Sequence, residues 1–298
     1  MSNFDAKTML GEIVLITGAD RGIGKETAKG LARMGATVVM ACLDLTKANP
    51  VGEAIKRKTR NEQIEVMQVD MASLSSIREF VARFCEKYDK LDVLINNAGL
   101  LWGGRAETED GFNRVMATNY FGPFLLTNLL LPTLKQAGEA RIINTSSLAH
   151  LWGRVNLGDS NSPKIWGFTG PYASSKLALI LFTQELSERL KGTNITANAV
   201  HPGIVATNIY HIGPVDSWYQ KLLIKMTGLV MISPQEGAQT GIYLASSDNV
   251  KGVTGKYFYK LHPVFTSLKC RDMKLQKGLW QLSEELTGLS SAAHFCQP

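Results

Sequence analysis

The stretch IVLITGADRGIGK, at residues 13–25, decides the fold of this chain. Its first four residues are all apolar, which is typical of a short strand buried on both faces. Glycines follow at positions 18, 22 and 24, and glycine allows a tight turn whose backbone can approach a pyrophosphate closely. The segment up to Met34 predicts a helix, whose N-terminus offers free N–H groups and the positive end of the helix dipole. This order predicts a dinucleotide phosphate site, and a purely structural turn is the alternative.

Strands and helices alternate along the rest of the chain. Apolar runs predict further strands at residues 37–42, 64–69, 93–95, 141–145, 195–200 and 256–259. Helices are predicted at residues 47–59, 73–88, 111–134 with a bend at Pro123, 171–190 and 234–245. This rhythm predicts an α/β fold with a doubly wound, Rossmann-type and mostly parallel sheet of about seven strands, with helices on both faces. No linker divides the chain, so we expect one NAD(P)-binding catalytic domain at residues 1–270, with a C-terminal helix and tail at 271–298 packed on it.

Composition and charge limit the classes of function. The chain has 298 residues and a formal net charge of +6, scattered without a run of five basic residues. Nucleic-acid binding therefore has little support, whereas cofactor phosphates or an anionic membrane surface could use the excess charge. The four cysteines lack metal-ligand spacing, which predicts free thiols and no metal site. No signal peptide or membrane-spanning segment is evident, so we expect a cytoplasmic protein, with peripheral contact at a membrane or lipid surface as the alternative.

Tyr172 and Lys176 form the most informative pair of side chains. They stand four residues apart in YASSK, at residues 172–176 of a predicted helix, so the phenol and the ammonium share a face. A cation ~4 Å away, at an effective dielectric of ~20, favours the phenolate by up to roughly 4 kcal/mol, which lowers a phenol pKa from ~10 by about three. Such a tyrosine can exchange a proton near pH 7, as general acid–base catalysis requires. The alternative is an ordinary surface pair.

Together these motifs resemble the short-chain dehydrogenase/reductase family. The ordered matches are Thr17-Gly18 with Gly22 and Gly24, Asp70, Asn96 to Gly99, Asn119, Ser147, Tyr172 with Lys176, and Pro202-Gly203. One such motif is weak evidence, but the ordered set is specific. The segments NYFG at 119–122, SSLAH at 146–150, LFTQEL at 181–186 and EGAQT at 236–240 resemble the retinol-dehydrogenase-like branch most.

The resemblance implies a cofactor site at the ends of successive strands. Its residues would be Thr17, Gly18, Asp20, Arg21, Gly22, Ile23, Gly24, Asp70, Met71, Asn97, Ala98, Gly99, Tyr172, Lys176, Pro202, Gly203, Val205 and Thr207. Asp70 would contact adenine, and residues 96–99 would shape the pocket beside the adenine ribose. Pro202, Gly203 and Val205 would line the nicotinamide, with Thr207 at its carboxamide or the phosphates. The alternatives are that the asparagines only form turns and that Asp70 only caps the helix near Ser73.

The end of the second strand bears on the choice between NAD and NADP. An acid there favours NAD, and an arginine binds a 2′-phosphate. The branch usually has arginine where this chain has Leu43, and NAD-preferring relatives tend to have aspartate where this chain has Cys42. Arg21 lies where NADP-using relatives often place a basic residue, whereas Asp44 favours NAD. We expect NADP(H) to be favoured over NAD(H).

The resemblance also implies a catalytic set of Asn119, Ser147, Tyr172 and Lys176. Tyr172 would be the acid/base, and Lys176 would lower its pKa and hold the nicotinamide ribose. Ser147, rather than Ser146, would hydrogen-bond the substrate oxygen. Asn119 would lie in a distorted helical turn and anchor a water of the proton relay. The alternatives are an ordinary loop serine and a surface asparagine.

The predicted function is an NAD(P)(H)-dependent oxidoreductase that interconverts an alcohol and a carbonyl by hydride transfer. The apolar segment at about 208–233 lies where the family has a substrate lid, so a small lipophilic substrate is implied, retinoid-, steroid- or aliphatic aldehyde-like. Core packing and a membrane-surface helix are the alternatives for that segment. A homodimer is the family default. The competing functions are a non-catalytic NADP-binding redox sensor, which needs no proton donor, and a sugar epimerase or dehydratase, whose first turn usually reads GxxGxxG.

Overall fold

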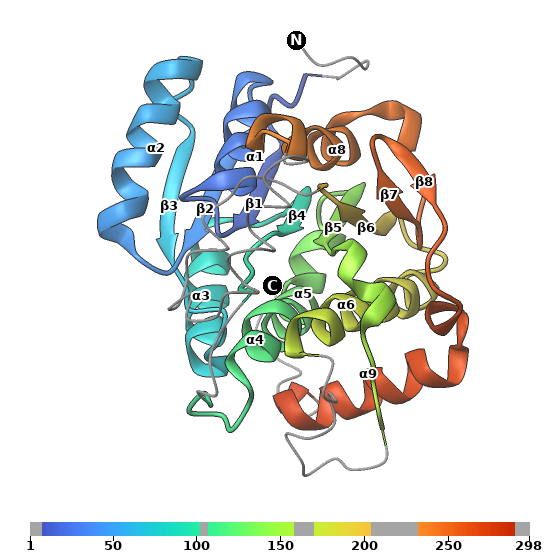
Figure 1. Cartoon of the computed structure of the whole chain (residues 1–298). Coiled ribbons are helices and arrows are strands. Elements are labelled where there is room, and N and C mark those ends of the chain that lie inside the picture. Colours follow the sequence, from blue (N-terminus) through green and yellow to red (C-terminus); the bar gives the residue numbers. More distant parts are fainter. Residues whose placement is uncertain (1–7, 102–106, 158–169, 204–231, 290–298) are drawn as a thin grey trace.

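The computed structural model of the chain describes residues 8–101, 107–157, 170–203 and 232–289. In these residues one eight-stranded sheet lies between two layers of helices (Figure 1). The strand order is β3-β2-β1-β4-β5-β6-β7-β8, and every neighbouring pair is parallel except β7 and β8. The strands are β1 Ile13–Thr17, β2 Thr37–Cys42, β3 Ile64–Gln68, β4 Val93–Asn96, β5 Ala140–Thr145, β6 Ile195–His201, β7 Tyr257–Tyr259 and β8 His262–Val264. The predicted doubly wound, mostly parallel sheet is confirmed.

The described sheet has one strand more than the sequence indicated. β8 pairs antiparallel with β7 across a two-residue turn in which Lys260 and Leu261 have φ values of 48° and 70°. A turn of this kind normally carries Asn or Gly at those positions, because both residues need positive φ. The three residues of β8 are all exposed. Neither the turn nor the strand therefore carries a recognisable sequence signal.

Helices cover both faces of the sheet. On one face α1, α2 and α8 enclose a core that includes Leu31 and Ile242. On the other, α3, α5, α6 and α9 enclose a core that includes Phe124 and Leu181 (Figure 1). The α-helices of the described residues are α1 Gly22–Arg33, α2 Leu45–Thr59, α3 Leu74–Lys87, α4 Arg114–Met116, α5 Gly122–Lys135, α6 Pro171–Arg189, α8 Pro234–Ser246 and α9 Met273–Thr287.

The helix predicted at residues 111–134 is interrupted by a π-helical turn, η1, at Ala117–Phe121. Pro123 lies in the first turn of α5, directly after this interruption. Because proline has no N–H, it cannot donate the α-helical hydrogen bond to the carbonyl of Asn119, four residues earlier. The predicted distortion at Pro123 therefore lies one turn before the proline, around Asn119.

The C-terminal helix α9 packs against α5 and α6. The Trp280 ring centroid lies 5.1 Å from that of Phe124 and 5.7 Å from that of Phe182. Gly288 ends α9 in the left-handed conformation, which glycine adopts readily. Among the described residues no helix is both long and apolar enough to span a membrane.

The cysteines differ from the expectation at one position. Cys42 and Cys270 are free and buried, as the sequence indicated. Cys85 is disulfide-bonded, so the prediction of free thiols is wrong for that residue. No group of His, Cys, Asp and Glu side chains in the described part of the chain could hold a metal ion.

Candidate active site

The glycine-rich turn joins β1 to α1 and packs against the end of β4. A Cβ on Gly24 would lie 2.3 Å from the Gly18 carbonyl oxygen, and one on Gly18 would lie 2.9 Å from the Ala98 Cα, so neither position accepts a side chain. Arg21 is the N-cap of α1 but makes no capping hydrogen bond through its side chain. The first N–H groups of α1 are therefore free of a side-chain cap and suit an anionic phosphate. The other residues expected in this turn are partly buried: Asp20, Gly22 and Ile23.

Thr17 and Asn97 fasten this turn to the sheet. Thr17 Oγ1 accepts hydrogen bonds from the N–H groups of Asn97 and Ala98, both at 3.0 Å. The Asn97 side chain donates to the carbonyls of Thr17 and Gly18 at 2.9 and 3.1 Å. Asn96 is buried instead and donates to polar side chains of α5 and β5. The asparagine at 97 thus holds the turn in shape, and the one at 96 holds the sheet to its helix layer.

Asp70 lines a cavity at the carboxyl ends of β2 and β3. The cavity has a volume of about 460 Å³, and its other lining residues include Leu43, Gln68, Ser76 and Arg83. Asp70 Oδ1 accepts a hydrogen bond from the N–H of Ala72 at 2.8 Å. Ser73, not Asp70, is the N-cap of α3, so the alternative in which Asp70 caps that helix is wrong. Met71 is almost fully buried beside it.

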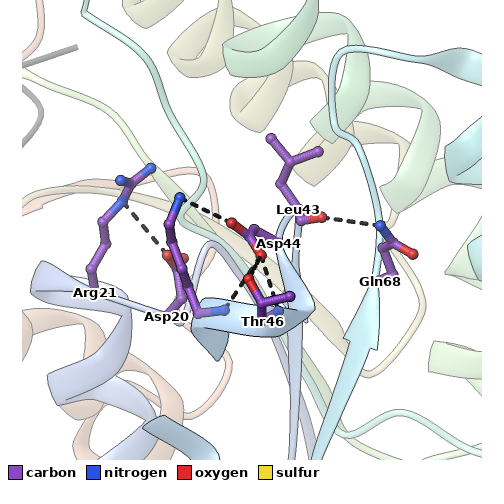
Figure 2. Close-up of polar contacts among 7 residues, drawn as sticks. Asp20, Arg21, Leu43, Asp44, Thr46 and Gln68 are labelled. Atoms are coloured by element: carbon purple, nitrogen blue, oxygen red, sulfur yellow. Dashed lines mark hydrogen bonds and ion pairs between the residues drawn. The ribbon is translucent and has the colours of Figure 1, made fainter. Parts of the chain in front are cut away.

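The Asp44 carboxylate caps the N-terminus of α2 (Figure 2). Its Oδ1 accepts from the N–H and the hydroxyl of Thr46 at 3.0 and 2.5 Å, and its Oδ2 lies 2.9 Å from Lys47 Nζ. The hydrogen bond from Thr46, followed by that from Lys47, lowers the pKa of Asp44 to about 2. Arg21, by contrast, is largely exposed, and its nearest acid is Asp20 at 3.7 Å (Figure 2). Near the end of β2, the Asp44 carboxylate is therefore already hydrogen-bonded, whereas the Arg21 guanidinium is accessible.

Tyr172 and Lys176 lie on one face of α6, as their spacing predicts. Lys176 is buried, and its Nζ lies 5.6 Å from the centroid of the Tyr172 ring. The same Nζ donates to the carbonyl of Thr145, the last residue of β5, at 2.8 Å. Burial lowers the pKa of Lys176 from 10.5 to about 8. A Cβ on Gly99 would lie 3.6 Å from this ammonium, so the segment after β4 lies beside the Lys176 side chain.

Asn119 lies in the π-helical turn and is fully buried. Its Oδ1 accepts from the N–H of Leu100 at 2.7 Å, and its Nδ2 donates to the Leu100 carbonyl at 2.9 Å. Nδ2 also donates to Ser175 Oγ at 3.0 Å, and that hydroxyl donates to the carbonyl of Tyr172 at 2.7 Å. The amide thus connects the segment after β4 with the first turn of α6. A surface asparagine, the alternative at this position, is ruled out.

Ser146 and Ser147 follow β5 but have different surroundings. Ser146 is buried, and its hydroxyl donates to the carbonyl of Lys176 at 2.8 Å. Ser147 is partly exposed, and its Oγ accepts from the N–H of Ala149 at 3.2 Å as the N-cap of the 3₁₀ turn η2, Leu148–Trp152. An accepted bond leaves the Ser147 hydroxyl proton available to a substrate, whereas the Ser146 proton is already committed.

Sequence reasoning missed two buried histidines behind this serine. His150 binds the Ser147 carbonyl through Nδ1 at 2.8 Å, and burial lowers its pKa. His201 ends β6, and burial, with a smaller contribution from His150, lowers its pKa to about 4. His150 stands three residues after Ser147 in SSLAH, but nothing in that pattern indicates that its ring is buried.

The nicotinamide end of the predicted site is described only in part. Pro202 and Gly203 follow β6, and Gly203 has a φ of 95°, which favours glycine. Val205, Thr207 and the predicted lid at about 208–233 lie outside the described residues, except for the lid's last two positions. Residues 158–169 of the loop between Ser147 and Tyr172 also lie outside them.

Known proteins resemble this chain over most of its length. A sequence profile of the family described as short chain dehydrogenase matches residues 12–212. Retinol dehydrogenase 13 of Homo sapiens is 40% identical over 294 residues, which cover 98% of this chain and 89% of that protein. Retinol dehydrogenase 12 of Mus musculus is 41% identical, over 94% of this chain and 87% of that protein.

Solved structures agree with the sequence comparison. An uncharacterized protein from Mycobacterium paratuberculosis has a TM-score of 0.75 at 35% identity, covering 97% of this chain and 98% of that chain. A short chain dehydrogenase from Shigella flexneri, complexed with NADP, has a TM-score of 0.67 at 25% identity, covering 85% and 98%. The chain therefore belongs to the short-chain dehydrogenase/reductase family of oxidoreductases, in its retinol-dehydrogenase-like branch.

Proposed function

We propose that this protein interconverts an alcohol and a carbonyl on a small lipophilic substrate with NADP(H), and that Tyr172 is its proton donor and acceptor. The observation that carries the proposal is the buried Lys176 ammonium beside the Tyr172 ring. This pair lies next to Gly99, and therefore next to the strand ends that build the dinucleotide turn. A sensor that only binds the cofactor has no use for a proton donor at this point.

The described residues fit a dinucleotide cofactor. The turn is too tight for a Cβ at Gly18 or Gly24, and the uncapped start of α1 suits a pyrophosphate. The cavity beside Asp70 suits adenine. When bound, the nicotinamide supplies or accepts the hydride exchanged with the substrate carbon. Lys176 would hold the nicotinamide ribose, and Pro202 and Gly203 would lie beside the ring.

The chain's own part in the reaction is to hold and move a proton. In carbonyl reduction the Tyr172 hydroxyl would donate its proton to the substrate oxygen, and in alcohol oxidation it would take that proton back. The Ser147 hydroxyl would donate a hydrogen bond to the same oxygen and stabilise the negative charge that develops there. Because the Ser146 hydroxyl is bound to the Lys176 carbonyl, it cannot take this part.

Lys176 and Asn119 would form a proton relay between Tyr172 and solvent. With a pKa of about 8, Lys176 is mostly protonated at pH 7, and the Thr145 carbonyl holds its ammonium in place. Pro123 cannot donate to the backbone carbonyl of Asn119, so that oxygen can bind a water. We place this water between Asn119 and Lys176 as the link to solvent.

The preference for NADP(H) is supported by the hydrogen bonds of Asp44. A carboxylate that binds the ribose hydroxyls of NAD must be able to accept their hydrogen bonds, and Asp44 already accepts two bonds from Thr46 at Oδ1 and pairs with Lys47 at Oδ2. Arg21 has a largely exposed guanidinium on the neighbouring turn, where it can pair with a 2′-phosphate. The NADP complex of the Shigella flexneri protein adds support.

A lipophilic substrate is supported by the names of the relatives, which are retinol dehydrogenases. In this chain the exposed side chains of Leu148 and Trp152 flank the turn that Ser147 begins, and they offer apolar surface beside the reacting atoms. A homodimer and peripheral contact with a lipid surface stay predictions from the resemblance.

Tyr172→Phe tests the proposal. Consumption of NADPH is measured with a panel of retinal, steroids, quinones and medium-chain aldehydes, and cofactor binding is measured by NADPH fluorescence. The variant should lose turnover and keep binding, because the ring remains and only the exchangeable proton is removed. Tyr88→Phe, on α3's C-cap, is the matched control and should keep both. Near-normal kcat in Tyr172→Phe would refute the assignment. Binding without turnover of any substrate by the unaltered protein would favour the sensor, and conversion of a sugar nucleotide without net NADPH consumption would favour the epimerase.

A further inference from the structure

His150 is a buried side chain that the proposed chemistry does not use. Its ring lies in η2, three residues after Ser147, with 1% of its surface exposed. Nδ1 lies 2.8 Å from the Ser147 carbonyl oxygen, and Nε2 accepts from the backbone N–H of Ser267 at 3.4 Å. Both ring nitrogens are therefore bound to backbone atoms, one before η2 and one more than a hundred residues later in the chain.

These two partners fix the tautomer of the ring. The Ser147 carbonyl can only accept, so Nδ1 must carry the proton, and the Ser267 N–H can only donate, so Nε2 must offer its lone pair. His150 is thus neutral, which agrees with the lowering of its pKa by burial. The Tyr257 ring packs edge-on against it, with 5.1 Å between centroids, and restricts its rotation.

The same C-terminal segment also contacts the end of η2. Lys269 Nζ donates to the carbonyl of Gly153, the C-cap of η2, at 2.9 Å. Ser267 therefore contacts η2 at its middle residue, His150, and Lys269 contacts its C-cap, with Lys269 in the 3₁₀ turn η6, Leu268–Arg271. Because Ser147 is the N-cap of η2, the direction of its Oγ depends on where this turn is held.

We propose that His150 is a positioning residue that holds the Ser147 hydroxyl toward the substrate oxygen and couples it to the C-terminal segment at Ser267. The proposal rests on the proposed function, since it acts through Ser147. It gives the segment before α9 a part in supporting the active site.

Three substitutions separate the two hydrogen bonds of the ring. His150→Asn keeps a donor near the place of Nδ1, His150→Gln keeps a polar group near the place of Nε2, and His150→Phe keeps only the packing against Tyr257. Loss of one hydrogen bond that acts in the transition state corresponds to about a tenfold loss of kcat. We expect that loss in His150→Phe and His150→Gln, with NADPH binding unchanged, and recovery of most of kcat in His150→Asn. His262→Asn, on the exposed strand β8, is the matched control and should change nothing.

A double-mutant cycle with Ser147→Ala decides whether His150 acts through the serine. If it does, His150→Phe should lower kcat about tenfold alone and have almost no further effect in the Ser147→Ala background. Equal losses in both backgrounds, or equal losses in the Asn and Phe variants, would overturn the inference and leave the proposed function standing. No loss of kcat in Ser147→Ala itself would overturn the inference together with the role proposed for Ser147, whereas the Tyr172→Phe experiment tests the proposed function separately. If His150→Phe does not fold, the His150→Gln variant in the same two backgrounds gives the same decision.

Discussion

Replacing Lys176 by methionine removes the cation beside Tyr172 and keeps a side chain of similar length. The Lys176 Nζ lies 5.6 Å from the centre of the Tyr172 ring. At an effective dielectric of ~20, a unit charge at that separation stabilises a phenolate by about 3 kcal/mol. One pKa unit corresponds to about 1.4 kcal/mol, so the inflection of the pH–rate profile for alcohol oxidation should move up by about two pH units. At pH 7 this lowers kcat/KM about a hundredfold.

The assay is alcohol oxidation followed as NADPH formation between pH 6 and 10. Lys87→Met is the matched control, because the exposed Lys87 places its Nζ 5.9 Å from the ring of the partly buried Tyr88, far from α6 along the chain. An unmoved inflection with unchanged kcat/KM in Lys176→Met would refute the electrostatic reasoning. An unmoved inflection with a lower rate would mean that Lys176 acts only by holding the cofactor.

The loss of activity should not come from loss of folding. Burial lowers the pKa of Lys176 from 10.5 to about 8, so the folded protein binds this proton less tightly than the unfolded chain does. The resulting penalty to stability is present in full below about pH 8 and fades as the pH rises toward 10.5. Lys176→Met removes the penalty, so its Tm at pH 7 should equal or exceed that of the unaltered protein.

Arg21→Glu should raise the KM for NADPH at least about tenfold, through loss of a charge-assisted hydrogen bond, and should change the KM for NADH little; equal effects on both would speak against a 2′-phosphate contact. Gly24→Ala should weaken NADPH binding at least about tenfold in a calorimetric titration, because the new Cβ meets the turn, whereas Gly241→Ala, where a Cβ meets nothing within 4 Å, should leave binding unchanged. Pro123→Ala should lower kcat several-fold and raise Tm, because the restored N–H can bond the Asn119 carbonyl; unchanged kinetics would argue against a water at that carbonyl.

The outline of the fold could be predicted because buried parallel strands have a simple signature. Runs such as Ile13 to Ile16 are apolar at every position, and in this sheet both faces are covered by helices. The cap at Ser73 and the stop at Gly288 were also predictable, because serine is preferred at helix N-caps and glycine just after helix C-termini. The pairing of Tyr172 with Lys176 follows from helical spacing alone.

The rest depends on contacts between segments that are distant in sequence. Whether Asp44 was free to bind a ribose could not be predicted, because the answer lies in how its lone pairs are shared with Thr46 and Lys47. The burial of His150 depends on Tyr257 and Ser267, which belong to the other end of the chain. The strand β8 was missed because its turn uses Lys260 and Leu261 where glycine or asparagine is usual.

The adjacent serines that follow β5 continue its extended backbone and its alternation of side chains. Successive side chains of a strand point to opposite sides, so two chemically identical hydroxyls reach opposite environments. Ser146 is joined to the backbone of α6, and Ser147 is left to the substrate. Inserting or deleting one residue in this short segment would exchange the two environments while the hydroxyl content stayed the same. The number of residues between β5 and η2 therefore cannot change by one without exchanging the two serines. Homologous chains should vary in length on either side of this segment rather than within it.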